Sequence, residues 1–168
     1  DTIAGGEGFD TIQGTDADDR IDLYSYTGDN TVERIDGGAG TDTVGVKYHA
    51  DFSNTEMVDV ENIEGGSPAN TIEGSQGDDN IFGMDGNDIL TGNAGDDMLD
   101  GGAGTDTVVY GGAFIDYSIN FNDDGTVSVR DLRSEGNEGA DVVKNMEYIQ
   151  FADAKLGLTQ DAINAYTG

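Results

Sequence analysis

Aspartate residues recur at nine-residue intervals in this chain, and each follows a glycine-rich stretch. In the second half the spacing is unbroken, because Asp79, Asp88, Asp97 and Asp106 follow one another at this interval. Hard divalent cations prefer oxygen ligands, and Ca²⁺ takes about six to eight of them from carboxylates and backbone carbonyls. Glycine has no Cβ, so a glycine-rich turn can aim several carbonyls into one pocket. The spacing therefore predicts a row of cation-binding turns.

The aspartates belong to a nine-residue repeat of the form Gly-Gly-x-Gly-x-Asp-x-U-x, in which U is a large apolar residue. The string from Asp36 to Val44 recurs letter for letter from Asp100 to Val108. A fixed short period indicates a stack of similar structural units. The units form two arrays, the first with Gly5–Gln13, Gly14–Asp22, Ser25–Glu33 and Gly37–Gly45, and the second with Gly65–Glu73, Gly74–Phe82, Gly83–Thr91, Gly92–Asp100 and Gly101–Val109.

If two nonapeptides make one coil of the stack, units n and n+2 lie directly above one another. The sixth-position aspartates of such units can then hold one ion between two coils. We expect two strong sites in the second array, one or two in the first, and weaker sites where asparagine replaces aspartate. The pairs that follow from this geometry are Asp79 with Asp97, Asp88 with Asp106, Asn70 with Asp88, Asp1 with Asp19, Asp10 with Asn30, and Asp19 with Asp42.

The charge balance also favours a bound cation. Among 168 residues, 35 acidic side chains face 7 basic ones, which gives a formal net charge of −28. One buried apolar side chain per unit contributes about 1.5–3 kcal/mol, which cannot offset roughly 1–2 kcal/mol of backbone ordering at every residue of the unit. A multivalent cation is the candidate for the missing stabilisation. The few Lys and Arg residues are scattered, which argues against nucleic-acid binding, and the absence of cysteine excludes thiolate metal sites.

Apart from the arrays, the sequence predicts short strands and no membrane-spanning segment. Residues 117–121 and 127–129 alternate apolar and polar side chains around the turn sequence 122–125, which predicts a β-hairpin. A further strand is expected within 142–151, and a short helix within 158–166. We divide the chain into a first array (1–45), a connector with a closing strand (46–64), a second array (65–109) and a β-rich C-terminal cap (110–168).

These repeats resemble the RTX (repeats-in-toxin) calcium-binding nonapeptide family. The resemblance implies an all-β fold, a right-handed parallel β-roll with a hairpin-containing C-terminal cap, in which the first six residues of each unit form the ion-binding turn. Ala17, Ala69 and Tyr26 depart from the pattern at glycine positions, and Asn30 and Asn70 depart from it at the aspartate. The implied Ca²⁺ ligands are Asp1, Asp10, Asp19, Asp42, Asp79, Asp88, Asp97 and Asp106, together with Gly6, Gly8, Gly38, Gly40, Gly77, Gly86, Gly95, Gly102 and Gly104. The side chains implied to face inward are Ile12, Ile21, Val32, Val44, Ile72, Ile81, Leu90, Leu99 and Val108.

The resemblance also implies type I export into calcium-rich extracellular medium, as part of a larger parent protein. The start of the chain in mid-unit at Asp1 fits that expectation. The predicted function is a non-catalytic, calcium-binding module that folds and becomes rigid when it binds several Ca²⁺ ions. One alternative is an adhesin-like module that binds a polysaccharide or a cell surface. Another is an accessory region of a secreted hydrolase, lyase or epimerase.

Other residues with chemical potential favour plainer interpretations. The fifth-position acids Asp18, Asp78 and Asp96 are expected to be solvated turn carboxylates rather than ligands. The segment 120–131 has EF-hand-like spacing, but its flanks predict strands, so a hairpin turn is favoured. His49 lies in a polar connector without a nucleophile elbow, and Glu61, Glu64 and Glu147 are expected on solvated strand faces. The tyrosines near the arrays (Tyr24, Tyr26, Tyr48, Tyr110 and Tyr117) are expected to pack in the core or cap rather than to form a sugar-binding surface.

Overall fold

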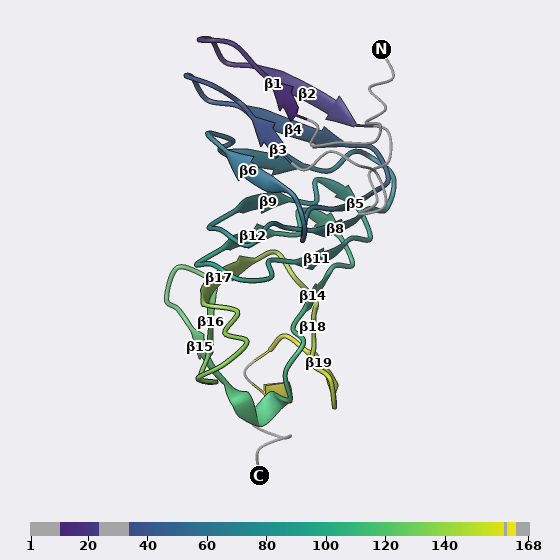
Figure 1. The fold of residues 1–168 in the computed structure, drawn as a ribbon. Coiled ribbons are helices and arrows are strands. Elements are labelled where there is room, and N and C mark those ends of the chain that lie inside the picture. Colours follow the sequence, from purple (N-terminus) through teal and green to yellow (C-terminus); the bar gives the residue numbers. More distant parts are fainter. Residues whose placement is uncertain (1–10, 24–33, 160, 164–168) are drawn as a thin grey trace.

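A computed structural model describes residues 11–23, 34–159 and 161–163. The chain forms a stack of short strands that runs from the N-terminal array at one end to the cap at the other (Figure 1). In the described part, the strands are joined by turns and one 3₁₀ segment, η1 (Phe114–Asp116), and residues 161–163 are helical. The all-β prediction is therefore confirmed, while most of the helix expected within 158–166 lies outside the described residues or is not helical.

One face of the stack is an eight-stranded sheet. Its strand order is β15-β16-β17-β12-β9-β7-β4-β2, and all neighbours from β17 to β2 pair in parallel. Parallel neighbours separated by a full coil are what a solenoid requires. The strands are β2 (Arg20–Leu23), β4 (Thr43–Val46), β7 (Asn62–Glu64), β9 (Asn80–Phe82), β12 (Met98–Asp100), β15 (Tyr117–Phe121), β16 (Val127–Asp131) and β17 (Ala140–Lys144).

The opposite face consists of two smaller sheets. A six-stranded sheet has the order β19-β18-β14-β11-β8-β5, and a three-stranded sheet has the order β1-β3-β6. Two very short strands, β10 and β13, pair within the turns. The bounds are β1 (Thr11–Gln13), β3 (Arg34–Asp36), β5 (His49–Asp51), β6 (Glu56–Val58), β8 (Thr71–Glu73), β10 (Asp85–Gly86), β11 (Ile89–Thr91), β13 (Ala103–Gly104), β14 (Thr107–Val109), β18 (Tyr148–Gln150) and β19 (Lys155–Gly157).

The coil length of the second array equals two nonapeptides. On one face Ile63 is the register partner of Ile81, and Ile81 that of Leu99. On the other face Ile72 pairs with Leu90, and Leu90 with Val108. Units n and n+2 are therefore stacked directly, as the repeat period predicts, and the parallel β-roll is confirmed.

The eighth-position side chains of the repeats form the core. Ile72, Ile81, Leu90, Leu99 and Val108 are completely buried between the two faces. Val44 and Ile12 are buried as well, Ile21 is half-buried, and Val32 lies outside the described residues. Each coil thus contributes two aliphatic side chains to a thin core, one from each face. The connector adds Ile63 and the fully buried Phe52, the largest side chain in this core.

The connector joins both arrays into one continuous stack. Its strand β7 lies between β4 of the first array and β9 of the second, in the eight-stranded sheet. On the other face, β6 pairs with β3 of the first array, whereas β5 pairs with β8 of the second. The eight-stranded sheet is consequently uninterrupted where the opposite face changes from the three-stranded to the six-stranded sheet.

The cap closes the end of the stack with the expected hairpin. Strands β15 and β16 pair antiparallel, and β16 pairs antiparallel with β17, which lies against β12 of the roll. Beneath them, Tyr110, Tyr117, Phe114 and Phe151 form an aromatic cluster, with ring centroids 5.1–5.9 Å apart. Tyr110 and Tyr117 are buried, which confirms the packing role expected for them. The hairpin also confirms the interpretation of 120–131, because Asp131 is buried against Arg133 rather than in an ion-binding loop.

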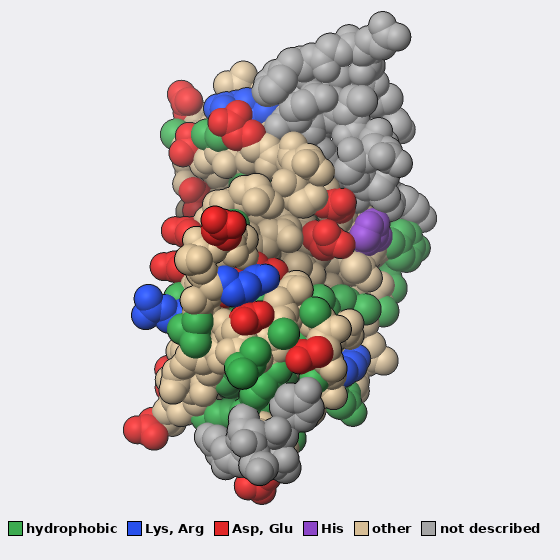
Figure 2. Space-filling view, turned by 60° about the horizontal axis from the view of Figure 1, so that its bottom comes forward, with side chains coloured by type: hydrophobic (Ala, Val, Ile, Leu, Met, Phe, Trp, Pro, Cys, Tyr) green, Lys and Arg blue, Asp and Glu red, His purple; other side chains and the backbone are tan. Residues whose placement is uncertain are grey.

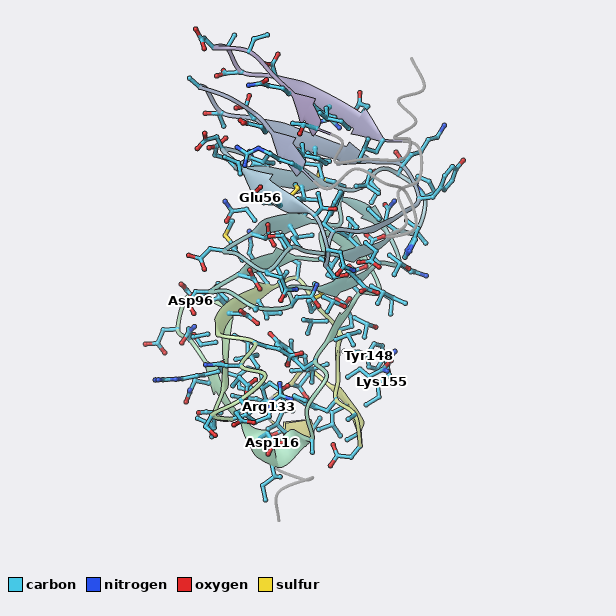
Figure 3. The ribbon with its side chains drawn as sticks, in the orientation of Figure 1. Glu56, Asp96, Asp116, Arg133, Tyr148 and Lys155 are labelled. Atoms are coloured by element: carbon cyan, nitrogen blue, oxygen red, sulfur yellow. The ribbon has the colours of Figure 1, made fainter. Side chains whose placement is uncertain are left out.

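Fifth-position side chains link successive coils through backbone amides. The carboxylate of Asp78 accepts a hydrogen bond from the Asp96 amide at 2.8 Å, and Asp18 accepts one from Thr41 at 2.9 Å. Asn87 makes the same contact with the Thr105 amide at 3.0 Å. The fifth-position acids are exposed, as expected for solvated carboxylates, but they also hold the next coil in register. Asp96 lies at the margin of the ribbon in Figure 3, on the side away from Tyr148 and Lys155.

We expect Asp78→Ala to lower the free energy of unfolding by about 1 kcal/mol, the typical net value of one hydrogen bond. Asp78→Asn should be nearly neutral, because Asn87 makes the equivalent contact without a charge. Equilibrium urea unfolding of both variants measures the difference. Equal losses in the alanine and asparagine variants would contradict the proposed role of the hydrogen bond.

Candidate metal sites

The glycine-rich turns lie along the two edges of the stack. The turns of edge A lead into the eight-stranded sheet, and those of edge B lead into the six-stranded sheet. Acidic side chains are spread over the molecular face shown in Figure 2, with few basic ones among them. The described repeat turns are 14–19, 37–42, 74–79 and 92–97 on edge A, and 65–70, 83–88 and 101–106 on edge B.

The sixth-position acids of successive coils are hydrogen-bonded to one another. One carboxylate oxygen of Asp97 accepts the backbone amide of Asp79 at 2.9 Å, and Asp106 accepts that of Asp88 at 2.7 Å. The same contact joins Asp42 to the Asp19 amide and Asp88 to the Asn70 amide, both at 2.7 Å. All predicted pairs within the described residues are therefore brought together. Asp1, Asp10, Asn30, Gly6 and Gly8 lie outside the described residues.

The second carboxylate oxygen has no partner in four of these turns. The Oδ2 atoms of Asp42, Asp88, Asp97 and Asp106 are buried and accept no hydrogen bond. The four residues are at most 2 % exposed, so water does not reach these oxygens. A buried polar atom without a partner is costly, and more so when it is charged. Four such atoms in equivalent positions therefore mark places suited to a positively charged ligand.

The turns fall into two conformations, distinguished by the second residue of the unit. In three turns this residue donates its amide to the sixth-position side chain of the same turn: Ser75 to Asp79 at 2.7 Å, Thr15 to Asp19 at 2.6 Å, and Gly66 to Asn70 at 3.0 Å. We call these turns closed. In the other four, which we call open, the second residue has a left-handed backbone, and the sixth-position Oδ2 is unpartnered. Their second residues are Gly38, Met84, Asn93 and Gly102, with φ from +73° to +98°.

The predicted glycine ligands divide in the same way. Gly40, Gly86, Gly95 and Gly104, the fourth residues of the open turns, have φ between +129° and +153°, a conformation that side chains rarely adopt. Gly77, the fourth residue of a closed turn, does not have a left-handed backbone. In the closed turn of Asn70, the side-chain amide donates to the Tyr48 carbonyl at 3.2 Å, so an NH₂ group lies where a cation would be needed.

The first glycine of an open turn lies beside converging oxygens. A Cβ added to Gly83 would be 2.6 Å from the unpartnered Oδ2 of Asp88 and 2.6 Å from the Gly101 carbonyl oxygen of the next coil. Within the described part of the chain, no three His, Asp or Glu side chains gather into a metal cluster. A cation in these turns would therefore take much of its coordination from backbone carbonyls, which suits Ca²⁺. The residues present fit such an ion.

Burial changes the proton affinity of these carboxylates. It raises the pKa of Asp79, Asp88 and Asp106 above the ordinary value, and nearby carboxylates add to the effect. Burial, with smaller contributions from Asp141 and Asp79, raises the pKa of Asp97 to about 8. Carboxylates in this environment need either a proton or a cation for their charge to be compensated.

Three acids outside the two predicted arrays also accept the backbone amide of a sixth-position acid. Glu61 accepts the Asp42 amide at 2.6 Å, Glu147 accepts the Asp106 amide at 2.7 Å, and Asp141 accepts the Asp97 amide at 3.0 Å. Glu61 and Glu147 are exposed, as expected for solvated carboxylates, but they precede β7 and β18 rather than lie within them, and each also holds an amide of the preceding coil. Glu61 and Glu147 share a five-residue sequence pattern that could have revealed them: Asp59-Val-Glu-Asn-Ile63 and Asn145-Met-Glu-Tyr-Ile149. The first residue of each segment has a left-handed backbone, with φ of +47° and +50°.

The remaining candidate groups have structural contacts. Glu64 forms an ion pair with Arg20 at 2.6 Å. His49 is half-buried in β5, where it pairs with Thr71 of β8. Tyr48 and Tyr148 are exposed, but they lie near β5 and in β18, with three strands between them in the six-stranded sheet. Tyr24 and Tyr26 lie outside the described residues. These positions do not combine into a single sugar-stacking platform.

We expect Gly83→Ala to be destabilising by about 1–3 kcal/mol, because its Cβ would occupy the space between Asp88 and the next coil. Gly66→Ala, at the second position of a unit, is the control for an uncrowded glycine, because the first glycines of closed turns are crowded too: a Cβ on Gly74 would be 2.7 Å from Asp79 Oδ2. A Cβ on Gly66 would meet Pro68 at an ordinary 3.5 Å, and the Gly66 backbone is not left-handed. Urea unfolding should place the control within about 0.5 kcal/mol of the parent chain. Similar values for the two variants would contradict this description of the turn.

In excess chelator, the folded fraction of the chain should fall as the pH rises from about 4, and the chain should be unfolded at neutral pH. Asp97 has a pKa of about 8 when folded, against about 3.9 when unfolded. The folded chain therefore binds more protons over this range, and deprotonation destabilises it. Circular dichroism of the chelated chain at a series of pH values, without urea, tests the sign of the slope of folded fraction against pH. Asp97→Asn should reduce the slope, and a folded fraction that increases with pH would contradict the assignment.

Comparisons with known proteins agree with this geometry. The family model of the RTX calcium-binding nonapeptide repeat matches four times, at residues 1–25, 59–90, 73–108 and 82–117, which together span half of the chain. Among 23 matching solved chains is the crystal structure of extracellular lipase LipA from Serratia marcescens. It has a TM-score of 0.56 and 15% sequence identity, and the match covers 73% of this chain but only 22% of the lipase chain.

That likeness concerns the fold alone, since the identity is low. No curated protein matches the chain. In the described residues, no helix is both long and apolar enough to cross a membrane. The register, the paired acids and the matched repeats lead to one assignment. The chain belongs to the RTX calcium-binding nonapeptide repeat family.

Proposed function

We propose that this chain is a module that binds several Ca²⁺ ions in the turns at its two edges, and that this binding drives its folding and makes it rigid. The observation that carries the proposal is the set of buried, unpartnered carboxylate oxygens in the four open turns. Two of them, in Asp88 and Asp106, lie on successive coils of edge B, where the first glycine of the Asp88 turn lies beside the Gly101 carbonyl of the next coil.

The donor set favours calcium over other metals. It consists of carboxylate and carbonyl oxygens, without thiolate, and Ca²⁺ accepts the irregular geometry that backbone carbonyls impose. Asp42, Asp88, Asp97 and Asp106 would hold the ions through their free oxygens, with carbonyls of the open turns. Asp19 and Asp79 remain in the proposed set, because their turns stack on those of Asp42 and Asp97. Their closed turns would bind more weakly, since a hydroxyl and an amide already engage the carboxylate.

Charge provides the link between binding and folding. At a net charge of −28, the chain repels itself when compact, and the stack brings its sixth-position acids together at every coil. A cation that binds only the stacked turns adds its binding free energy to folding. The apolar core of two aliphatic side chains per coil then needs to supply only part of the stability.

The setting that we propose is extracellular, within a larger secreted protein. Sites that hold Ca²⁺ with few carboxylates and many carbonyls should have low affinity. The calcium sites of extracellular modules also have low affinity, with dissociation constants of about 10⁻⁴–10⁻³ M. Such sites would be empty in a calcium-poor cytosol and filled outside the cell. The lipase that shares this fold is extracellular, and the repeat family implies export by a type I system within a parent protein whose catalytic domain, where there is one, lies elsewhere. The repeat itself is a binding unit and performs no reaction.

An adhesin-like role for the rigid module is the alternative that we retain. It is supported only by exposed side chains such as Tyr48, Ile89 and Tyr148 along the outer face of the six-stranded sheet. A glycan array probed with and without Ca²⁺ separates the two functions. Calcium-dependent retention of a glycan would favour the alternative.

Calcium titration of the chelated chain tests the proposal. We expect β-type circular dichroism and a smaller radius of gyration to appear together as Ca²⁺ is added, because folding and binding are coupled. Asp88→Asn should weaken the apparent Ca²⁺ affinity by about tenfold or more. Loss of a residue that only hydrogen-bonds to a metal ligand typically costs that much, and Asp88 is proposed as a ligand itself. Asp123→Asn, in the exposed hairpin turn, is the control for loss of one charge.

A compact, β-rich chain in excess chelator at neutral pH would contradict calcium-driven folding. Equal effects of Asp88→Asn and Asp123→Asn would contradict the assigned sites.

A further inference from the structure

Residues 136–144 read as another nonapeptide unit, separated from the second array by the hairpin. The segment Gly-Asn-Glu-Gly-Ala-Asp-Val-Val-Lys has the glycines, the sixth-position aspartate and the eighth-position apolar residue of the repeat. It shares its first, second, fourth and sixth residues with Gly92–Asp100, Gly-Asn-Ala-Gly-Asp-Asp-Met-Leu-Asp. The segment lies beyond residue 117, where the last family match ends.

This unit occupies the next coil position on edge A. Val143 is the parallel register partner of Leu99 and is completely buried, as Leu99 is. The Asp97 amide donates to Asp141 at 3.0 Å, which repeats the 2.9 Å contact from the Asp79 amide to Asp97. The fifth-position link is repeated too, because the Ala140 amide donates to Asp96 at 2.9 Å. The stack therefore continues through the cap, and the hairpin is an insertion within a coil.

We propose that the turns 92–97 and 136–141 enclose a further Ca²⁺ site, in which Asp97 and Asp141 supply the carboxylates and the cap is tied to the roll. The proposal rests on the calcium-binding function proposed above. It adds a site that depends on the cap, not only on the recognised repeats.

An unpartnered carboxylate oxygen and a buried phenol beside Asp141 support this site. Asp97 is 2 % exposed and its Oδ2 accepts no hydrogen bond. Tyr110 is 3 % exposed, and its hydroxyl approaches Asp141 without forming a proper hydrogen bond to any described atom. Asp141 is itself 2 % exposed. A buried phenol and two buried carboxylates thus lie together, with at least one oxygen of each kind still able to bind a ligand.

The fourth-position glycine of the new turn approaches the preceding coil as closely as that of an open turn does, although Asn137, the second residue, is not left-handed. This glycine, Gly139, has φ of +83°, and a Cβ there would lie 1.6 Å from the Gly95 carbonyl oxygen. Gly104 makes the same close approach to the Gly86 carbonyl, at 1.5 Å. The nearby basic residues are engaged elsewhere, since Arg133 pairs with Asp131 and Glu138, and Lys144 pairs with Asp100. Without a basic partner, this pair needs a bound cation or a proton to compensate its charge.

The test compares Asp141→Asn with Asp123→Asn in the whole chain. Asparagine keeps the Oδ1 that accepts the Asp97 amide and removes only the charge. By titration calorimetry with Ca²⁺, Asp141→Asn should bind one ion fewer than the parent chain, and Asp123→Asn should bind the same number. A full number of ions in Asp141→Asn, with unchanged affinity, overturns the site and leaves the proposed function intact. Absence of calcium binding by the parent chain overturns both.

A second measurement does not depend on the folding of Asp141→Asn. Terbium replaces calcium in oxygen sites, and its luminescence is sensitised by an adjacent tyrosine. Tyr110→Phe retains every carboxylate, so it should bind the same number of Ca²⁺ ions as the parent chain but lose part of the sensitised terbium emission. Emission equal to that of the parent chain would overturn the placement of an ion beside Tyr110.

Discussion

The stack depends on a shared carboxylate at each edge of each coil. One oxygen of the sixth-position acid accepts an amide from the neighbouring coil and so fixes the distance between coils. The other oxygen is buried by that same stacking, and in the open turns nothing in the protein satisfies it. Coils that stack in the correct register therefore always bury these carboxylates, and they leave a set of buried oxygens without a partner. The stacked coils impose a condition: the charge on those oxygens must be compensated, by a proton or by a cation.

The second residue of each unit determines how that condition is met. With Ser75 or Thr15 in this position, the amide and hydroxyl of the turn bind the carboxylate, and the turn satisfies itself. With a left-handed residue such as Gly102 or Asn93, the amide points elsewhere and the oxygen remains free. Turns that satisfy their own carboxylate and turns that leave one of its oxygens free therefore occur in one stack. Glycine is found at the second position of both kinds, as Gly66 and Gly102 show, so its backbone conformation and not its residue type separates them.

The repeat period was enough to predict the coil, the inward side chains and the acid pairs, because each follows from a fixed spacing of residue types. The open and closed turns were not predictable from the aspartates alone, since Met84 takes a backbone conformation usually left to glycine. Glu61 and Glu147 escaped the pattern for a geometric reason. Their turns are shorter than the repeat turns, and the longer glutamate side chain reaches the amide that aspartate reaches elsewhere. The role of Asp141 was hidden by the hairpin, which separates it by 44 residues from its register neighbour Asp97.

These closing acids explain how such a stack can end. A final coil still exposes the amides of its sixth-position residues, and a repeat turn placed there would itself need a further coil. The short turns of Glu61 and Glu147 supply the carboxylate without the glycine-rich loop, so they satisfy the last amide and create no new opening of the repeat type. Between the arrays, the short turn of Glu61 stands in place of a repeat turn, so the second array need not continue the nine-residue spacing of the first. At this point β7 keeps the eight-stranded sheet continuous. At the far end, β17 pairs with the antiparallel β16 of the hairpin, so the parallel stacking of coils ends there and β15 becomes the edge strand of the sheet.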